Sequence, residues 1–463
     1  MPIPLATRCL LSLLLCAWFA QAAPLVAADG DLDTDFWGDG KMSYSSVYDG
    51  TFRVGSVLAA PDDRLVVVAA RQRVSDPGAL FWQRVGSTAL STICNFEPPG
   101  GATGVWDVYG AVGTFDVAGR LLIAGTVEYG AGNLVAVVAR FLYPNCTLDT
   151  AFDGDGYATF DLTPEDEIAT AIDTDIAARV YVVGAKGLAD ADQEMLVMRL
   201  QSDGDLDPTF SGNGWLTLDS LGLARQDQAM AVTVQADHKP VVAGYANVAT
   251  GNFDAVAVRF TLTGALDSTF SGDGVASVDF DLGGLYDTAY EVAFDFGSGR
   301  LALGGSADAP GTRRASVAVL TSSGALDTGF SGDGKSTFLV EGSDQSALSG
   351  VVFDGLGRLV ATGIAYDGVS GPADFAIVRL APNGALDSNF GPNGSVTVPF
   401  DLSGSTFHDQ ATAIAFQSGR PVVGGQVRHS DDRFRPALVR LETALVFADG
   451  FDTGSTLAWR SWY

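Results

Sequence analysis

The sequence has little positive charge and few of the residues that most catalytic and metal sites need. Among its 463 residues, 27 are Lys or Arg and 55 are Asp or Glu, a formal net charge of −28. A surface this acidic repels phosphate groups, so nucleic acid is excluded as a partner. The three histidines, His238, His408 and His429, are scattered and match no metal-ligand spacing. No G-x-S-x-G or C-x-x-C motif occurs, and we predict no catalytic, cofactor-binding or metal-ligating residue.

Long apolar runs are also missing beyond the N-terminus, where spanning a membrane would take about 20 such residues. Residues 1–22 have the order of an export signal: an arginine, the short apolar stretch Cys9–Ala20, and the small-x-small cleavage pattern Ala20–Ala22. A lipoprotein is excluded because the bulky Leu15 precedes Cys16. We expect residues 1–22 to be a signal peptide, no transmembrane segment, and a mature protein that is secreted, periplasmic or at the cell surface.

Cysteine is scarce, and removal of the signal peptide would leave only Cys94 and Cys146. An oxidising compartment permits a disulfide between these two residues. They lie in successive repeats, whose matching positions are usually too far apart to bridge. The sequence therefore leaves two states open, a disulfide or two unpaired buried thiols.

Helical periodicity is absent outside the signal peptide. The sequence instead repeats a short motif, Leu-Asp-x-x-Phe, which we call the phrase. Its last four phenylalanines are 60 residues apart. The copies are Gly30–Phe36, Cys146–Phe152, Gly204–Phe210, Gly264–Phe270, Gly324–Phe330 and Gly384–Phe390. A degraded copy is expected to end at Phe96, again 60 residues after Phe36. A fixed period of this size is typical of propellers, solenoids and arrays.

Basic residues recur in the same frame and set the number of units at seven. One begins an apolar run in each unit: Arg64, Arg120, Arg179, Lys239, Arg300, Arg358 and Arg420. A second ends the next run: Arg84, Arg140, Arg199, Arg259, Arg379 and Arg440, with Val319 in the fifth unit. They could form an anion-binding stripe. The favoured interpretation is that they pair within each blade with the repeated aspartates: Asp33, Asp149, Asp207, Asp267, Asp327 and Asp387.

Each unit carries about four strand-length runs, with period-two alternation and β-branched residues. In the sixth unit these are Ser336–Leu339, Leu348–Phe353, Leu359–Thr362 and Phe375–Leu380. Units of this length are too large for typical open solenoids, whose repeats run to roughly 45 residues. We predict an all-β fold, a seven-bladed β-propeller of four-stranded antiparallel blades.

The predicted propeller occupies residues 30–443 as a single domain and leaves residues 444–463 as a C-terminal aromatic tail. In this frame the Leu-Asp-x-x-Phe phrase is expected to link the outer strand of one blade to the inner strand of the next. Its Leu and Phe would fill the space between blades. The tail is interpreted as an aromatic flap on the ring, with a sorting or surface-association element as the alternative.

These features together resemble the bacterial delta-60 repeat. The shared pattern is Leu-Asp-x-x-Phe-x-x-x-Gly, an acidic loop, a Gly-Arg/Lys turn with an apolar run, and an Arg-Leu pair before the next glycine. Gly324–Gly384 and Gly384–Leu441 are the cleanest copies, and the resemblance covers about residues 30–441. It implies a secreted bacterial β-propeller-like protein and no particular chemistry. The sequence departs from the pattern over Cys94–Val105, where the second blade would begin.

Two motifs raise the question of a ligand. Gly329–Ser336 matches the phosphate-loop pattern GxxxxGK[ST], but a strand is expected after it where the mechanism needs a helix. Asp31–Asp35 and Asp153–Gly156 place carboxylates at alternate positions, as calcium loops do, yet Phe36 occupies the place of the required glycine. We therefore expect solvated Asp-Gly turns and no cofactor, with calcium as the alternative.

The sequence predicts a secreted, non-enzymatic, monomeric propeller that binds or scaffolds a protein or glycan partner. Function in propellers lies where repeats differ, so the irregular loops are the candidate surfaces: Ser75–Gly104, Gly187–Glu194, Asp308–Arg314, Tyr366–Asp374 and His429–Arg435. The alternative is an extracellular polysaccharide hydrolase or lyase with acidic residues at the channel. Non-repeated Asp, Glu, Tyr or His side chains at the channel mouth would favour the enzyme.

Overall fold

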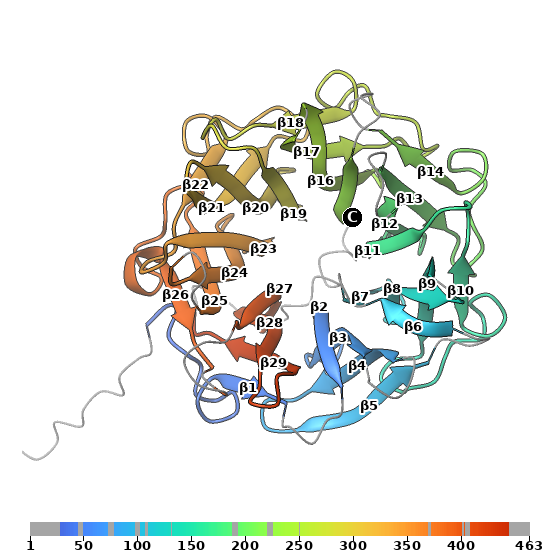
Figure 1. Cartoon of the computed structure of the whole chain (residues 1–463), viewed down its shortest axis with the longest axis horizontal. Coiled ribbons are helices and arrows are strands. Elements are labelled where there is room, and N and C mark those ends of the chain that lie inside the picture. Colours follow the sequence, from blue (N-terminus) through green and yellow to red (C-terminus); the bar gives the residue numbers. More distant parts are fainter. Residues whose placement is uncertain are drawn as a thin grey trace, which may run out of the picture.

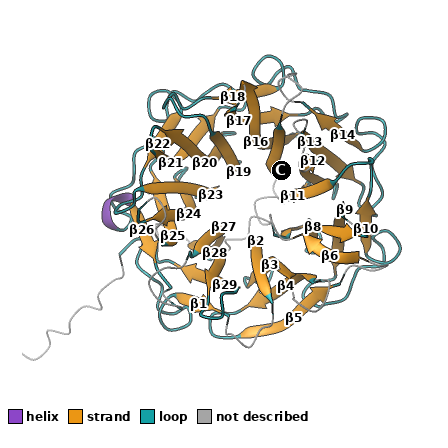
Figure 2. Ribbon diagram, in the orientation of Figure 1, coloured by secondary structure: helices purple, strands orange, loops and turns teal. Residues whose placement is uncertain are grey.

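The computed structural model describes residues 28–44, 50–72, 78–97, 102–106, 110–130, 132–187, 193–219, 226–249, 251–368, 372–400, 402 and 408–443. These residues fold into seven antiparallel β-sheets arranged as blades around a central axis (Figure 1). Strands and loops make up nearly all of the described chain, together with the 3-10 turn η2 (Pro392–Gly394), as Figure 2 shows. The prediction of a seven-bladed, all-β propeller is confirmed.

Each blade begins with an inner strand beside the axis and continues outward. Blade 1 is β2 (Thr51–Ala59), β3 (Leu65–Gln72), β4 (Ala79–Val85) and β5 (Leu90–Phe96). Blade 3 is β11 (Glu167–Thr174), β12 (Val180–Lys186), β13 (Glu194–Leu200) and β14 (Trp215–Leu218). Blade 4 is β15 (Asp227–Val234), β16 (Pro240–Ala249), β17 (Asn252–Arg259) and β18 (Val275–Val278).

The fifth and sixth blades follow the same order, and the other two depart from it. Blade 5 is β19 (Asp287–Phe294), β20 (Leu301–Ala309), β21 (Thr312–Leu320) and β22 (Lys335–Phe338). Blade 6 is β23 (Gln345–Phe353), β24 (Leu359–Tyr366), β25 (Ala373–Leu380) and β26 (Ser395–Val398). In blade 2, β6 (Ala102–Trp106) and β7 (Val112–Phe115) share the inner position beside β8 (Leu121–Tyr129), β9 (Asn133–Phe141) and β10 (Tyr157–Phe160).

Blade 7 closes the ring with strands from both ends of the chain. Its first three strands are β27 (Gln410–Gln417), β28 (Arg420–Arg428) and β29 (Phe434–Arg440), and its outer strand is β1 (Lys41–Ser43) (Figure 1). The pairing of β1 with β29 joins residues almost 400 positions apart, such as Lys41 and Val439. Backbone hydrogen bonds thus fasten the N-terminal segment to the last blade.

The Leu-Asp-x-x-Phe phrase lies elsewhere than predicted. In blade 5 it falls between the third strand and the outer strand, because Leu326 bridges to Leu320 at the end of β21 and β22 begins at Lys335. The expectation that it links one blade to the next is therefore wrong. The expected degraded copy is also wrong, because Phe96 ends the outer strand β5 and a short turn at residues 86–89 joins β4 to β5.

The hydrophobic core lies between blades as well as within them. One cluster combines Val241 and Ala257 of blade 4 with Val292 and Leu303 of blade 5, and the phrase residue Phe270 is buried among them. The phenylalanines of the six phrase copies are all buried at 1% exposure or less. A single sheet could not bury both of its faces, so neighbouring blades stabilise one another.

Candidate functional site

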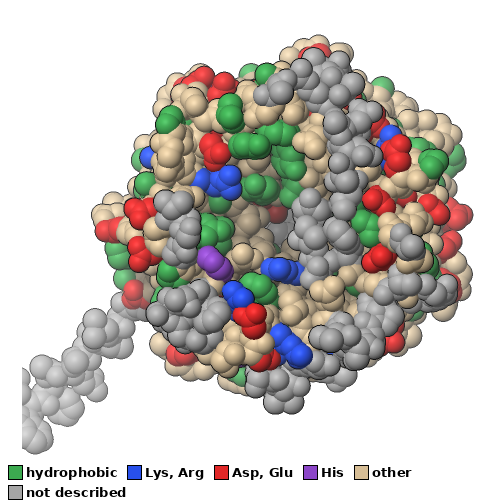
Figure 3. Space-filling view, in the orientation of Figure 1, with side chains coloured by type: hydrophobic (Ala, Val, Ile, Leu, Met, Phe, Trp, Pro, Cys, Tyr) green, Lys and Arg blue, Asp and Glu red, His purple; other side chains and the backbone are tan. Residues whose placement is uncertain are grey.

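A cavity of about 420 Å³ lies on the axis of the propeller, between the inner strands. All seven blades contribute to its wall, through β2, β7, β11, β15, β19, β23 and β27. The space-filling view down the same axis shows the surface hollowed at its centre (Figure 3). A volume of this size is within the range of small-ligand sites.

A one-residue β-bulge in the inner strands determines which side chains face this cavity. In β19 the pairing with β20 shifts between Ala289 and Glu291, so Tyr290 is the unpaired residue. A bulge of this type turns two successive side chains toward the same side, and both Tyr290 and Glu291 line the cavity. The opposite residue is Gly305, where an added Cβ would lie 1.8 Å from the carbonyl oxygen of Thr288. Only glycine permits this close approach.

Glu291 breaks the pattern of the other bulged strands. The residue that follows the bulge is small in each of them: Ser56, Ala171, Ala231, Gly350 and Ala413. Among the described residues that line the cavity, Glu291 carries the single carboxylate. Burial raises the pKa of this carboxyl to about 7, against a hydrogen bond of 3.0 Å that the Val292 N–H donates to its Oε1. The negative charge of Asp173 adds to the increase.

Arg53 supplies the single cationic side chain among the described residues of the cavity wall. Its guanidinium lies over the ring of Phe434, 4.6 Å from the centroid. Near it, the Val54 N–H donates to Gln426 Oε1 at 3.0 Å, and Gln426 Nε2 donates to Gln410 Oε1 at 2.9 Å. Blades 1 and 7 thereby bring a guanidinium and two amides to one part of the wall.

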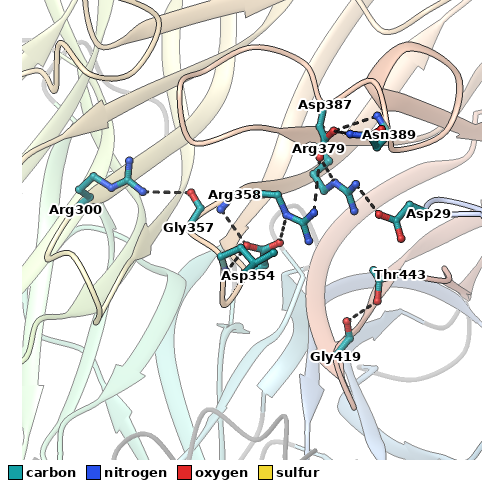
Figure 4. A network of polar contacts seen from close by, with 11 residues as sticks. Asp29, Arg300, Asp354, Gly357, Arg358, Arg379, Asp387, Asn389, Gly419 and Thr443 are labelled. Carbon is teal, nitrogen blue, oxygen red and sulfur yellow. Dashed lines mark hydrogen bonds and ion pairs between the residues drawn. The ribbon is translucent and has the colours of Figure 1, made fainter. Parts of the chain in front are cut away.

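The recurring arginines at the ends of the third strands lie away from the cavity, at the opposite end of the blades. Arg199 donates to Asp207 at 2.8 Å and to the Leu262 carbonyl of the next blade at 2.5 Å, and lies over Phe210. The pairing with a phrase aspartate and the contact with a phrase phenylalanine recur at Arg140, Arg259, Arg379 and Arg440. Of these, Arg140 and Arg259 also donate to a carbonyl of the next blade. Figure 4 shows one instance, in which Arg379 binds Asp387 and also Asp29. Pairing with the repeated aspartates is therefore confirmed for most of the recurring basic residues. Arg64 and Arg84 pair with Asp62 instead, and Arg179 pairs with Asp175.

The motifs that raised the question of a ligand are engaged in the fold. Asp33, the central carboxylate of Asp31–Asp35, is fully buried. It forms ion pairs with Arg440 and Arg420. Lys335 of the phosphate-loop match begins strand β22 and pairs with Asp281. Over the described parts of the chain, no three His, Cys, Asp or Glu residues gather into a possible metal site.

The structure joins Cys94 of β5 and Cys146 of the β9–β10 loop in a disulfide, with Cα atoms 5.2 Å apart. Since β5 is the outer strand of blade 1 and Cys146 belongs to blade 2, the bond ties the two blades together. The two cysteines occupy different structural positions in their units, so the argument from matching repeat positions does not apply. Neither cysteine lines the cavity.

None of the irregular loops predicted as candidate surfaces contributes a described residue to the cavity wall. The predicted signal peptide, the tail at 444–463 and, within Ser75–Gly104, residues 75–77 and 98–101 lie outside the described residues. Sequence reasoning missed Arg53, Tyr290 and Glu291. An alignment of the inner strands by their bulges would have exposed Glu291, because the equivalent residues are small. Within the described ranges, no helix has the length and apolar character needed to cross a membrane.

Three stretches of the chain match a family described as "Domain of unknown function (DUF5122) beta-propeller": residues 179–210, 235–270 and 357–390. Each runs from the turn before the second strand to the phrase phenylalanine, in blades 3, 4 and 6. These matches support a β-propeller family. The delta-60 resemblance remains a prediction. No curated protein matches the chain in sequence.

Several solved structures resemble the chain at low identity. Hydrazine synthase of Kuenenia stuttgartiensis has a TM-score of 0.40 and 12% identity, over 69% of this chain and 76% of its own. An α-L-arabinofuranosidase of Fusarium graminearum has 0.41 and 10%, over 71% and 92%. An aldose sugar dehydrogenase of Streptomyces coelicolor has 0.39 and 12%, over 87% and 98%. These likenesses concern the fold alone.

Proposed function

We propose that this protein is an exported propeller that binds a glycan in the cavity on its axis without cleaving it. The observation that supports the proposal is a cavity of about 420 Å³ in which Glu291 is the single carboxylate of the described wall. Glycoside hydrolysis ordinarily takes two carboxylates, one on each side of the scissile bond. A wall with one carboxylate, one arginine and several hydroxyl and amide groups suits recognition of a hydroxylated ligand.

The remaining parts of the proposal rest on the sequence. The signal peptide at residues 1–22 supports export, and the net charge of −28 makes copies repel one another, which supports a monomer. A protein partner is the second binding hypothesis, since the irregular loops of the rim could contact a surface much larger than the cavity. Binding of a glycan that survives changes in those loops would favour the cavity.

A polysaccharide hydrolase or lyase is the second candidate function. It is favoured by one observation, the pKa of about 7 for the Glu291 carboxyl, which is suited to proton transfer near neutral pH. Tyr290 beside it adds a second ionisable group to the same wall. The two candidates differ in whether the ligand leaves intact.

A glycan array with the purified mature protein tests the proposal, followed by chemical analysis of each bound glycan. We expect binding without new reducing ends and without an unsaturated sugar. The matched variant is Glu291→Gln, which keeps the size and hydrogen-bonding oxygen of the side chain. Binding that persists in this variant while cleavage disappears would establish the enzyme instead. An array with no bound glycan would refute the proposed function.

A further inference from the structure

We infer that Arg53 and Gln410 form a subsite for a sugar residue that carries a carboxylate, such as a uronic acid. The inference rests on the proposed function, because it assigns the chemical class of the glycan that the cavity takes. It begins from charge: in a protein of net charge −28, Arg53 lines the cavity without an ion pair to any described residue. An arginine in such surroundings has abundant carboxylates to bind, so its isolation is informative.

The guanidinium of Arg53 is held in place before any ligand arrives. Its contact is with the face of Phe434, 4.6 Å from the centroid, and Arg428 approaches the same ring at 6.0 Å. Cation–π contact fixes the plane of a guanidinium and leaves its N–H groups at the edge. A planar set of donors held in one orientation matches the two oxygens of a carboxylate.

The neighbouring Gln410 adds an N–H donor to this part of the wall. Gln426 Oε1 accepts from the Val54 N–H, and Gln410 Oε1 accepts from Gln426 Nε2. Both amide oxygens are therefore engaged, whereas Gln410 Nε2 has no partner among the described residues. Arg53 and Gln410 both line the cavity. A ligand at this part of the wall meets the N–H donors of Arg53 and of Gln410 Nε2, which favours an acceptor such as a carboxylate.

Elsewhere on the wall, two hydroxyl groups offer acceptors instead of donors. The Thr170 hydroxyl donates to the Ala229 carbonyl at 2.8 Å, and the Ser349 hydroxyl donates to the Ala411 carbonyl at 2.6 Å. With their hydrogens used, these oxygens can only accept from a ligand, and so can an ionised Glu291. This part of the cavity favours a ligand with several O–H donors.

A sugar acid has both properties in one small molecule. Its carboxylate would pair with Arg53, and its hydroxyls would donate to the acceptors of the wall. A peptide C-terminus offers a carboxylate but few donors within a comparable volume. The protein's overall charge repels polyanions at long range, so one acidic residue per bound glycan is favoured over a run of them.

The test measures affinity calorimetrically for glucuronic, galacturonic and mannuronic acid disaccharides, each paired with its neutral analogue, and for a short peptide with a free C-terminal carboxylate. We expect one uronic acid to bind roughly ten- to a hundred-fold more tightly than its neutral analogue, as for a hydrogen bond to a charged group. Arg53→Gln is expected to abolish this preference. Arg53→Lys should retain part of it, because a single ammonium keeps the charge and loses the bidentate geometry.

Two further variants keep the outcome clear. Arg313→Gln is the matched control, because Arg313 lies on the same rim, pairs with Asp308 at 2.9 Å and does not line the cavity. Gln410→Glu should also abolish acid binding, because its new carboxylate can pair with Arg53 while still accepting from Gln426. Melting temperatures identify any variant that has failed to fold.

The outcomes separate the inference from the proposed function. Equal binding of acidic and neutral sugars, or an unchanged preference in Arg53→Gln, would overturn the subsite and leave glycan binding intact. Tighter binding of the peptide than of every sugar acid would overturn the assignment to sugars. An absence of binding to all of these sugars would overturn the subsite, and an array without any bound glycan would remove the proposed function as well.

Discussion

Arginine is used in opposite ways at the two ends of the propeller. At the end away from the cavity, Arg199 of β13 binds a carboxylate, a carbonyl of the next blade and a phenylalanine ring. At the cavity, the guanidinium of Arg53 lies over the ring of Phe434 and pairs with no carboxylate of the described residues. Five blades share the carboxylate and the ring of the first arrangement, whereas no other described cavity residue repeats the second. An arginine whose N–H groups are all engaged within the fold has a structural role. An arginine on a cavity wall without a carboxylate partner is suited to binding a ligand.

The largest effect is expected from breaking the ion pair between Arg199 and Asp207. In Arg199→Met, Asp207 would keep a buried charge without its arginine, which typically costs about 3–5 kcal/mol. Denaturant unfolding measures the loss. The double variant Arg199→Met/Asp207→Leu removes both charges and should recover much of it. We call the contacts of Arg199 with Asp207 and Phe210 the clamp. A fall in the free energy of unfolding of less than about 1 kcal/mol in the single variant would show that the clamp contributes little to the stability of the ring.

Blade 1 extends the comparison, because it lacks the phrase loop and its clamp. In addition to the shared hydrophobic cluster, the Cys94–Cys146 disulfide ties it covalently to blade 2. Replacing both cysteines with serine should cost about 2–4 kcal/mol, since the bond closes a loop of moderate length. Thermal melting under oxidising and reducing conditions measures this, and the variant should show no difference between them. An equal melting temperature for reduced and oxidised wild-type protein would contradict the prediction.

Two buried aspartates sharpen the comparison through pH. Burial raises the pKa of Asp207, but bonds from Thr209 and Arg199 outweigh it and hold the pKa low. Asp287 accepts from the Phe280 N–H and pairs with no cation among the described residues. Burial and the charge of Asp279 raise its pKa to about 6.

Since the folded pKa of Asp287 exceeds its unfolded value near 3.9, its protonation favours the folded state. This contribution to stability should therefore grow as pH falls from about 7 toward 4, by roughly 1–2 kcal/mol after allowance for other groups. Asp287→Asn should remove that part of the pH dependence and stabilise the protein at pH 7.5. Unfolding measured across this range checks it, and an identical profile in the variant would refute the assignment.

The smallest effect is expected from completing the clamp that blade 5 lacks. Val319 stands where the other blades have arginine, and Asp327 has Arg300 at 3.9 Å as its cation. In Val319→Arg the side chain can reach Asp327 and the ring of Phe330, for a gain of about 0.5–1 kcal/mol. A rise of a few degrees in melting temperature would support this geometry. A fall would mean that the valine packing in blade 5 is worth more than the clamp.

The sequence predicted the blades and most of their ion pairs because both recur at a fixed spacing along the chain. It misplaced the Leu-Asp-x-x-Phe phrase for a physical reason. A repeat has no unique starting point, so the spacing of Phe210 and Phe270 is the same whether the phrase lies within a blade or between blades. Only the hydrogen-bonded register, in which Leu206 bridges to Leu200, decides the matter.

The cavity residues were out of reach for a different reason. Tyr290 and Glu291 face the same side only because a bulge interrupts the alternation of β19. Strict period-two reasoning places neighbouring residues on opposite faces. Arg53 and Phe434 are nearly 400 positions apart in the chain, and they meet because the ring closes between blades 7 and 1.

The closure of blade 7 has a consequence for how the molecule is made. Strand β1 emerges early in synthesis, yet its partner β29 is nearly the last strand to appear. The N-terminal segment must therefore wait, unpaired, until almost the whole polypeptide has left the ribosome. For a polypeptide destined for export, this delay would keep the closed toroid from forming before the translocation machinery has engaged the chain.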